Sequence, residues 1–339
     1  MTDDLKIALK TQAQALGFSA LGVVEAAPSP TLAAYERWID AGMHGSMGYL
    51  ARPDRVARRR NLNVILPQVR SIVVVVLDYA QWVAPQVLND PARGRIASYA
   101  WGVDYHEVMT PRLKRLAAWL GESSAVYVDT GAILERSHAQ QAGLGFIGKN
   151  TMLIHPRRGS YFFIGEILTT AALEPDPPHT ATMCGRCTRC LVACPTDAFP
   201  APYVLDARRC ISYHTIENKG SIPEDLRASF GNWVYGCDVC QEVCPWQRFS
   251  APTQEEAFHV VDVDRAAPPL AWLLTMTPQA FSARFAGSAI LRTGYERMVR
   301  NACIAAGNSG DPALKPLLAA LTRHPSPLIA QHAAWALGR

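Results

Sequence analysis

The chain has 339 residues, of which 49% are hydrophobic and 18% are charged, and its formal net charge is +4. This composition is typical of a folded globular protein and excludes a disordered or fibrous chain. No stretch approaches the roughly 18 apolar residues of a membrane span, and the N-terminal residues lack the pattern of an export signal. We therefore expect a cytoplasmic protein without membrane contact, and its length predicts more than one domain.

The first part of the chain predicts a sheet covered by helices, an α/β domain over residues 1–178. The unbroken β-branched run Ser71–Leu77 is typical of a strand buried on both faces. The proline-rich segment Glu174–His179 cannot continue a helix or strand, so we place the domain boundary there. Further helices are expected at 5–16, 31–41, 111–120 and 133–142, and strands at 125–128, 151–154 and 161–169.

The rest of the chain divides into a cysteine-rich module over residues 179–250 and a helical region over residues 251–339. The latter begins with a polar, proline-bearing linker at 250–269 and continues in helices at 294–306, 312–322 and 327–337. These resemble a stack of HEAT-like helical repeats. Residues 283–339 contain seven basic and two acidic side chains. This excess of positive charge fits either a polyanionic partner or solvated helix faces.

Eight of the nine cysteines follow an iron-sulfur pattern. The run Cys184-x2-Cys187-x2-Cys190-x3-Cys194-Pro has the spacing of bacterial ferredoxins, in which the fourth cysteine binds a different cluster from the first three. A second run, Cys237-x2-Cys240-x3-Cys244-Pro, lacks one ligand, which Cys210 supplies. The spacing thus predicts two 4Fe-4S clusters with the following ligands. One is bound by Cys184, Cys187, Cys190 and Cys244, and the other by Cys194, Cys210, Cys237 and Cys240.

Two alternatives bear on the cysteines. Zinc is the other metal that such residues bind, but zinc sites favour two separated cysteine pairs over three evenly spaced thiols. Cys303 lies in a helical, apolar pattern and is expected to be a small buried residue without a metal.

A glycine-rich segment, Gly143–Asn150, matches a dinucleotide fingerprint letter by letter. That motif needs a strand before the glycines and a helix after them, and here the predicted order is reversed. We therefore exclude a nucleotide site and expect the glycines to let the backbone approach another large ligand closely.

Asp129 is the main candidate for acid chemistry, because it follows a predicted strand at its carboxyl end, where α/β sheets bind ligands. The alternative is that Asp129 only caps the next helix. Tyr105 and His106 are further candidates for proton handling. The arginine run 52–60 could bind phosphates or carboxylates, or could be a solvated helix face.

Together these motifs resemble the epoxyqueuosine reductase family over nearly the whole chain. The segments that carry the resemblance are Val128–Gly131, Ala142–Asn150, Gly159–Tyr161, Gly165–Glu166, Arg209–Tyr213 and His332–Gly338, together with the cysteine runs. The resemblance implies that the epoxide oxygen of epoxyqueuosine in a tRNA anticodon loop leaves as water, which yields queuosine. It also implies a bound cobalamin that receives electrons from the two clusters, an unidentified electron donor and a monomeric protein.

The resemblance also implies roles for individual residues. Asp129 matches the family's proton donor to the departing oxygen, for which a buried acid with a raised pKa is expected. Residues 213–219 match the approach to the anticodon loop, and Ser98 stands where many members have arginine. The positions expected around cobalamin are Arg59, Asp129, Arg136, Lys149, Leu153, Ser160, Ser212 and Asp238. The expected tRNA contacts, which include basic residues of the tail, are Glu217, Lys219, Arg292, Arg297, Arg300 and Arg323.

Two other functions remain open from the sequence. A dehalogenase-like cobalamin reductase acting on a small molecule would share the cofactors, although the basic helical tail and the missing export signal speak against it. A non-catalytic iron-sulfur protein for electron transfer or RNA binding would need neither cobalamin nor Asp129.

Overall fold

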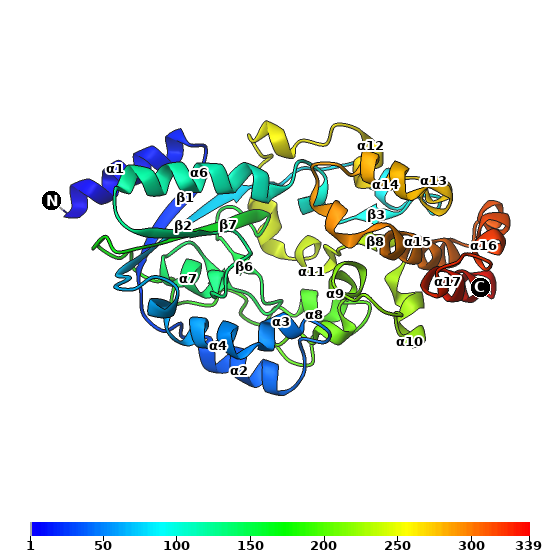
Figure 1. Ribbon diagram of the computed structural model, residues 1–339, viewed down its shortest axis with the longest axis horizontal. Helices are drawn as coiled ribbons and strands as arrows, with labels where there is room; N and C mark the ends of the chain where they lie inside the picture. Colours follow the sequence, from blue (N-terminus) through cyan, green and yellow to red (C-terminus); the bar gives the residue numbers. More distant parts are fainter. Residues whose placement is uncertain (1) are drawn as a thin grey trace.

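The protein was analysed as a computed structural model that describes residues 2–339, with the two ends of the chain on opposite sides of the molecule (Figure 1). The elements before the cysteines are α1 (Thr2–Ala15), β1 (Ala20–Glu25), α2 (Leu32–Asp40), α3 (Gly48–Ala51), α4 (Pro53–Arg60), β2 (Ser71–Asp78), α5 (Pro85–Leu88), β3 (Arg95–Ile96), α6 (Tyr105–Leu120), β4 (Ser124–Tyr127), α7 (Glu135–Gln141), β5 (Phe146–Ile147), β6 (Leu153–Ile154) and β7 (Phe162–Thr169). Those that follow are α8 (Arg189–Ala193), α9 (Ile211–Ile216), α10 (Glu224–Arg227), β8 (Trp233–Tyr235), α11 (Val239–Glu242), α12 (Val263–Ala266), α13 (Leu270–Thr275), α14 (Pro278–Arg284), α15 (Tyr295–Ser309), α16 (Lys315–Leu321) and α17 (Pro327–Leu337).

A four-stranded sheet in the order β1-β2-β7-β4 organises the first part of the molecule. All neighbouring strands are antiparallel. As predicted, β2 is buried on both faces, because its β-branched side chains point alternately into two apolar cores. Strand β1 was not predicted, and β4 lies at the edge and is only half-buried, so the prediction of a second fully buried strand there is wrong.

Helices cover the sheet on both sides (Figure 1). Helices α1 and α6 pack on one face with Val73 and Val75, and α7 packs on the other with Val74. Helix α6 begins at Tyr105, before the predicted start at Pro111, because the Asp104 carboxylate accepts a hydrogen bond from the backbone N–H of His106 at 3.0 Å and caps the helix.

The cysteine-bearing segments lie between the sheet and the C-terminal helices, on the short helices α8, α9 and α11 (Figure 1). Strand β3 from the first part of the chain pairs in parallel with β8 from the cysteine region. The segment 250–269, predicted as a linker, packs into the core: Phe258 is 2% exposed and Ala266 is fully buried. The backbone N–H of Gly94 also donates a hydrogen bond to Pro268 O at 2.9 Å, so the segment 250–269 is tied to the first part of the chain.

Helices α13, α15, α16 and α17 form a packed helical group at the C-terminal end. Asn301 on α15 ties this group to the cysteine region, since its amide donates to Thr215 O at 2.9 Å and to Val234 O at 2.8 Å. As predicted, Cys303 is fully buried among apolar neighbours. Within residues 2–339 no helix combines the length and apolar character that crossing a bilayer requires.

Candidate functional site

Four cysteines from both runs line one cavity of about 170 Å³, at the ends of α8 and α11. They are Cys184, Cys187, Cys190 and Cys244, the set expected to bind one cluster. Burial raises the pKa of the Cys190 thiol, and the other three thiols of this set add to that effect because like charges repel. The donor set and the space between the thiols therefore suit a cluster bound by thiolates.

The other four cysteines gather deeper in the same region. Burial raises the pKa of Cys210, with a smaller contribution from Cys194, and burial likewise raises the pKa of Cys237, with Cys210 and Cys240 as contributors. Such mutual effects need thiols that lie near one another. Among residues 2–339 no three His, Cys, Asp or Glu side chains converge as the ligands of one metal ion do. A cubane, in contrast, spreads its four thiolates around a whole iron-sulfur core.

The glycine-rich segment is hydrogen-bonded to the backbone of both cysteine runs. Lys149 donates to Gly185 O at 2.8 Å and to Cys187 O at 2.9 Å, and the Asn150 amide donates to Cys240 O at 3.1 Å. A Cβ at Gly145 would lie 2.5 Å from Ile154 O, so at this position the chain's own packing requires glycine. These glycines let the chain pack against its own β5–β6 hairpin.

Asp129 follows β4 on an exposed loop and has a left-handed backbone, with φ of 55°. This conformation costs free energy in non-glycine residues and is concentrated at functional sites. The Tyr105 hydroxyl donates to Asp129 Oδ2 at 2.8 Å, so the structure brings together two of the predicted proton-handling residues. Burial and the nearby Asp129 charge raise the pKa of Tyr105 above its usual value, which keeps this hydroxyl protonated as a donor. The expected burial of Asp129 is wrong, because its side chain is exposed.

Three residues of the predicted site region have buried polar atoms without a partner. Among the described residues, Arg59 Nε, Glu135 Oε1 and Ser98 Oγ are buried and accept or donate no hydrogen bond. Burial, together with the neighbouring charges of Glu166 and Asp129, raises the pKa of Glu135 to about 8. Unpartnered donors and acceptors of this kind suit a ligand that carries amide groups, as the corrin ring of cobalamin does.

The positions predicted around cobalamin come from two sides of the site. Arg136 is exposed and donates to Thr151 O at 3.1 Å, while Arg59 is buried and stacks on the Tyr35 ring. On the cysteine side, Ser160 Oγ donates to Gln241 Oε1 at 2.9 Å. Ser212 is half-buried on α9, and Leu153 is buried on β6.

Asp238 is the buried acid of the cysteine side. Burial raises the pKa of Asp238 to about 6, although its carboxylate accepts a hydrogen bond from the Ser98 backbone N–H at 2.6 Å. Asp238, Cys240 and Arg136 all influence the pKa of Tyr79, which burial raises well above its usual value. Residues from the cysteine module and from α7 therefore share one neighbourhood around Tyr79.

Two protein-family models match parts of the chain. Residues 59–130 match a model described as epoxyqueuosine reductase QueG, and residues 183–247 match a 4Fe-4S double cluster binding domain. The epoxyqueuosine reductase of Pseudomonas aeruginosa is 40% identical over 98% of this chain and 93% of the relative. The chain belongs to the epoxyqueuosine reductase family. The Escherichia coli epoxyqueuosine reductase is 38% identical over 96% of this chain and 86% of the relative.

Solved epoxyqueuosine reductase structures share the whole fold. One of them, in complex with an epoxyqueuosine-modified stem loop of tyrosine tRNA, superposes with a TM-score of 0.91 at 33% identity and covers 100% of this chain and 90% of that chain. The Bacillus subtilis enzyme, with its catalytic aspartate loop swung out of the active site, has a TM-score of 0.89 at 32% identity and covers 100% of this chain and 91% of that chain. The expected mixed helix and strand fold with an iron-sulfur module is thus confirmed.

The predicted tRNA positions separate into exposed and buried residues. Lys219 and Arg323 are exposed, and Arg292 is half-exposed and forms an ion pair with Glu217. Arg297 is half-buried and donates to Ile216 O at 2.6 Å.

Arg300 has no exposed surface, and its guanidinium donates to the carbonyls of Asn218 and Gly220 at 2.7 Å each. It cannot reach a phosphate, and the prediction that it contacts tRNA is corrected on this ground. An amphipathic pattern does not reveal that an arginine points inward to cap loop carbonyls, so the burial of Arg300 could not be predicted from it.

Tyr49 is a site residue that the sequence did not single out. Burial raises the pKa of Tyr49, and the charges of Glu217 and Asp129 raise it as well, whereas Arg292 lowers it. Tyr49 is 45% exposed, so it lies at the surface between the predicted acid and the segment predicted to approach the anticodon loop. Its only sequence signal is its place after the glycine loop 42–48, in which Ser46 Oγ accepts a hydrogen bond from Tyr213 at 2.8 Å.

Proposed function

We propose that this protein reduces epoxyqueuosine to queuosine in the anticodon loop of tRNA, with cobalamin that is reduced by two 4Fe-4S clusters. The observation that carries the proposal is the hydrogen bond from the buried Tyr105 to Asp129 on an exposed loop, near Tyr49 and the Glu217–Arg292 ion pair. A proton donor thus adjoins a surface where a base from a nucleic acid could enter. Full-length similarity to epoxyqueuosine reductases, one of them bound to a modified stem loop, supports the same function.

The reaction needs two electrons and two protons, because the epoxide oxygen leaves as water while its two carbons become an alkene. Cobalamin, when bound, supplies a strongly reducing metal centre for this step. Asp129 gives a proton to the departing oxygen. Tyr105 binds Oδ2 of Asp129 and so leaves Oδ1 to carry that proton toward the substrate.

Cobalamin would be held by Arg59, Arg136, Lys149, Leu153, Ser160, Ser212 and Asp238, with Asp129 facing it. Residues 1–178 would form the catalytic α/β domain, 179–250 the two-cluster module and 251–339 a HEAT-like region for tRNA. The clusters would use the two cysteine sets named above. We further propose that the protein acts in the cytoplasm as a monomer and receives electrons from a separate donor.

The alternative functions have less support. A small-molecule reductase would leave the Glu217–Arg292 pair near Tyr49 and Asp129 without a role. A non-catalytic electron carrier would not need an aspartate held in a strained conformation by a buried tyrosine.

The test is Asp129→Asn, assayed anaerobically on a stem loop that carries epoxyqueuosine, with dithionite as reductant. We expect turnover to fall by about a hundredfold, the usual scale for the loss of a general acid. The variant should still contain about eight irons per chain and should still shift the absorption bands of added cobalamin. Asp40→Asn, a change at another exposed aspartate, is the matched control and should turn over normally. Wild-type turnover by Asp129→Asn would show that Asp129 has only a structural role.

A further inference from the structure

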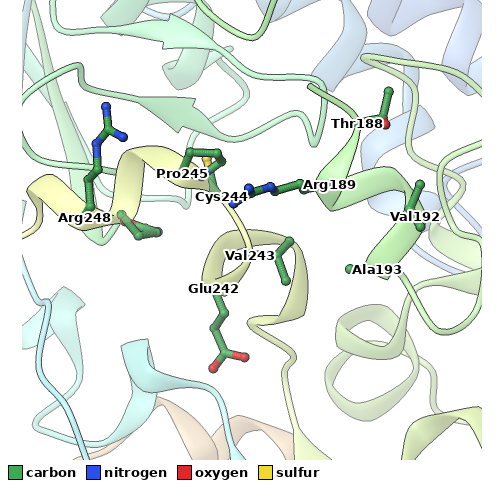
Figure 2. Close-up of a pocket in the computed structure, with 10 residues that line it drawn as sticks. Thr188, Arg189, Val192, Ala193, Glu242, Val243, Cys244, Pro245 and Arg248 are labelled. Carbon is green, nitrogen blue, oxygen red and sulfur yellow. The ribbon is translucent and has the colours of Figure 1, made fainter. Parts of the chain in front are cut away.

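An open hollow of about 760 Å³ lies beside the first cysteine group (Figure 2). One wall is α8, with Thr188, Arg189 and Val192, and the other is the segment from Glu242 to Arg248. Figure 2 shows Arg189 pointing across the hollow toward Cys244 and Pro245. Cys244 belongs to both the wall of this hollow and the cavity that the first cysteine group lines.

The two cysteine groups differ in their surroundings. Exposed residues flank the first group, such as Met183, Arg186 and Thr188. Buried residues flank the second group, such as Thr196, Ile211 and Asp238. A redox group near the surface exchanges electrons with a separate molecule more readily than a buried one, so the first group is the suitable entry point for electrons.

The surface around the hollow is basic and apolar. Arg186, Arg189 and Arg248 are exposed, and none of them forms an ion pair with a carboxylate in the described part of the chain. Glu242, the acid in the wall, is paired with Arg95 and extends away from Arg189 (Figure 2).

Val192 lines the hollow, Met183 lines the adjoining cavity of the first cysteine group, and the Phe249 ring lies under the Arg248 guanidinium. Val192 is 80% exposed, Met183 is 42% exposed and Phe249 is 41% exposed. Apolar groups of this size within a ring of one charge are typical of a protein-binding surface.

We infer that this face, formed by Met183, Arg186, Arg189, Val192, Arg248 and Phe249, docks a small electron-carrier protein whose one-electron redox group has an acidic rim. The inference rests on the proposed function and identifies the type of donor. In each encounter the carrier loses one electron and the first cluster gains one, so two encounters supply one epoxide reduction. A weak interface of this kind depends on charge for its association rate and therefore on salt.

The test uses reconstituted protein and, as a probe, an acidic flavodoxin reduced to its hydroquinone. Stopped-flow absorption at low salt follows the bleaching of the clusters. We expect the double variant Arg189→Glu, Arg248→Glu to be reduced by the flavodoxin at least about tenfold more slowly than wild type, with the difference lost at high salt. Reduction by dithionite, a small molecule that needs no docking, should be unchanged. Lys114→Glu, Arg115→Glu on α6 is the matched control and should behave like wild type.

Equal flavodoxin rates for the double variant and wild type would overturn the inference. If the double variant loses iron, the test uses Val192→Asp instead. Val192 is exposed and is not adjacent to a cysteine in the sequence, and the aspartate adds one negative charge to the same face. A wild-type rate for that variant would overturn the inference equally. Failure of the proposed function is seen separately, as absence of dithionite-driven epoxyqueuosine reduction by the wild-type protein.

Discussion

Asp129 and Glu135 lie on the same loop-to-helix segment but have opposite surroundings. The Asp129 side chain is exposed and is held by Tyr105, whereas Glu135 Oε1 is buried and unpartnered. Glu166, close behind Glu135, is fully buried and paired with His138 at 3.0 Å. One acid can thus reach a substrate, while the other keeps its proton because ionisation next to Glu166 is unfavourable.

Glu135 makes stability depend on pH. Burial raises its pKa from 4.5 to about 8 in the folded protein. Between these values the folded protein holds a proton that the unfolded chain has released, so the free energy of unfolding falls as pH rises through this window. Glu135→Gln removes that titration and should raise the apparent Tm more at pH 8.5 than at pH 6, in thermal unfolding of the anaerobic holoprotein.

The matched control is Glu122→Gln, at an exposed glutamate, which should leave the pH dependence of Tm as in wild type. A Glu135→Gln variant whose Tm differs from wild type by the same amount at both pH values would contradict a protonated Glu135.

At the scale of elements, α15 connects the C-terminal helices to the cysteine region. Its buried face holds Arg300 and Asn301, which bond to carbonyls around α9 and β8. Near its other end, Gly307 lies against α17: a Cβ there would be 2.8 Å from Ala336 Cα. The close approach of these two helices therefore depends on the missing side chain.

Gly307→Val should separate α15 from α17 and lower the free energy of unfolding by about 1 to 3 kcal/mol, the usual cost of overpacking. Ala319→Val, at an exposed position of α16, also introduces a valine; helix propensity disfavours valine against alanine there but favours it over glycine at 307, so propensity cannot explain a loss in Gly307→Val. Denaturant unfolding of both variants measures the difference. Equal losses in the two variants would show that α17 tolerates a side chain at position 307.

At the scale of the whole molecule, distant parts of the sequence meet around Asp129. Tyr49 from the first helices, Asp129 after β4, Glu217 after α9 and Arg292 before α15 influence one another electrostatically. Lys219, an exposed cation two residues after Glu217, belongs to the segment 213–219 that is predicted to approach the anticodon loop.

Lys219→Glu combined with Arg323→Glu should weaken binding of all substrate tRNAs alike, because contacts to phosphate fix position without reading sequence. Each lost contact should also flatten the dependence of log affinity on log salt by about one unit. Affinity measured at several salt concentrations tests this, with Lys114→Glu on α6 as the control for added negative charge. Unchanged affinity and slope in the double variant would remove these residues from the tRNA surface.

Part of the fold could be predicted from local pattern. The β-branched run of β2 and the spacing of the cysteines each follow a physical rule that acts over a few residues, and both are present as predicted. The reversed context of the glycine segment also agrees with the structure, since α7 precedes the segment, β5 lies within it and β6 follows it.

Other features depended on contacts between distant segments. The antiparallel order β1-β2-β7-β4 follows from pairing across the chain, and an edge position made β4 half-buried although its residues suit a buried strand.

The sequence by itself determined which residues could do chemistry: eight thiols in two sets, an aspartate after a strand and a basic tail. Only the tertiary structure decided which of them can meet a partner. It buried Arg300 against loop carbonyls, exposed Asp129 beside Tyr105 and gave the first cysteine group a basic, open hollow. The reason is physical: residue type sets charge and donor atoms, whereas burial and hydrogen-bond partners are set by segments far away along the chain.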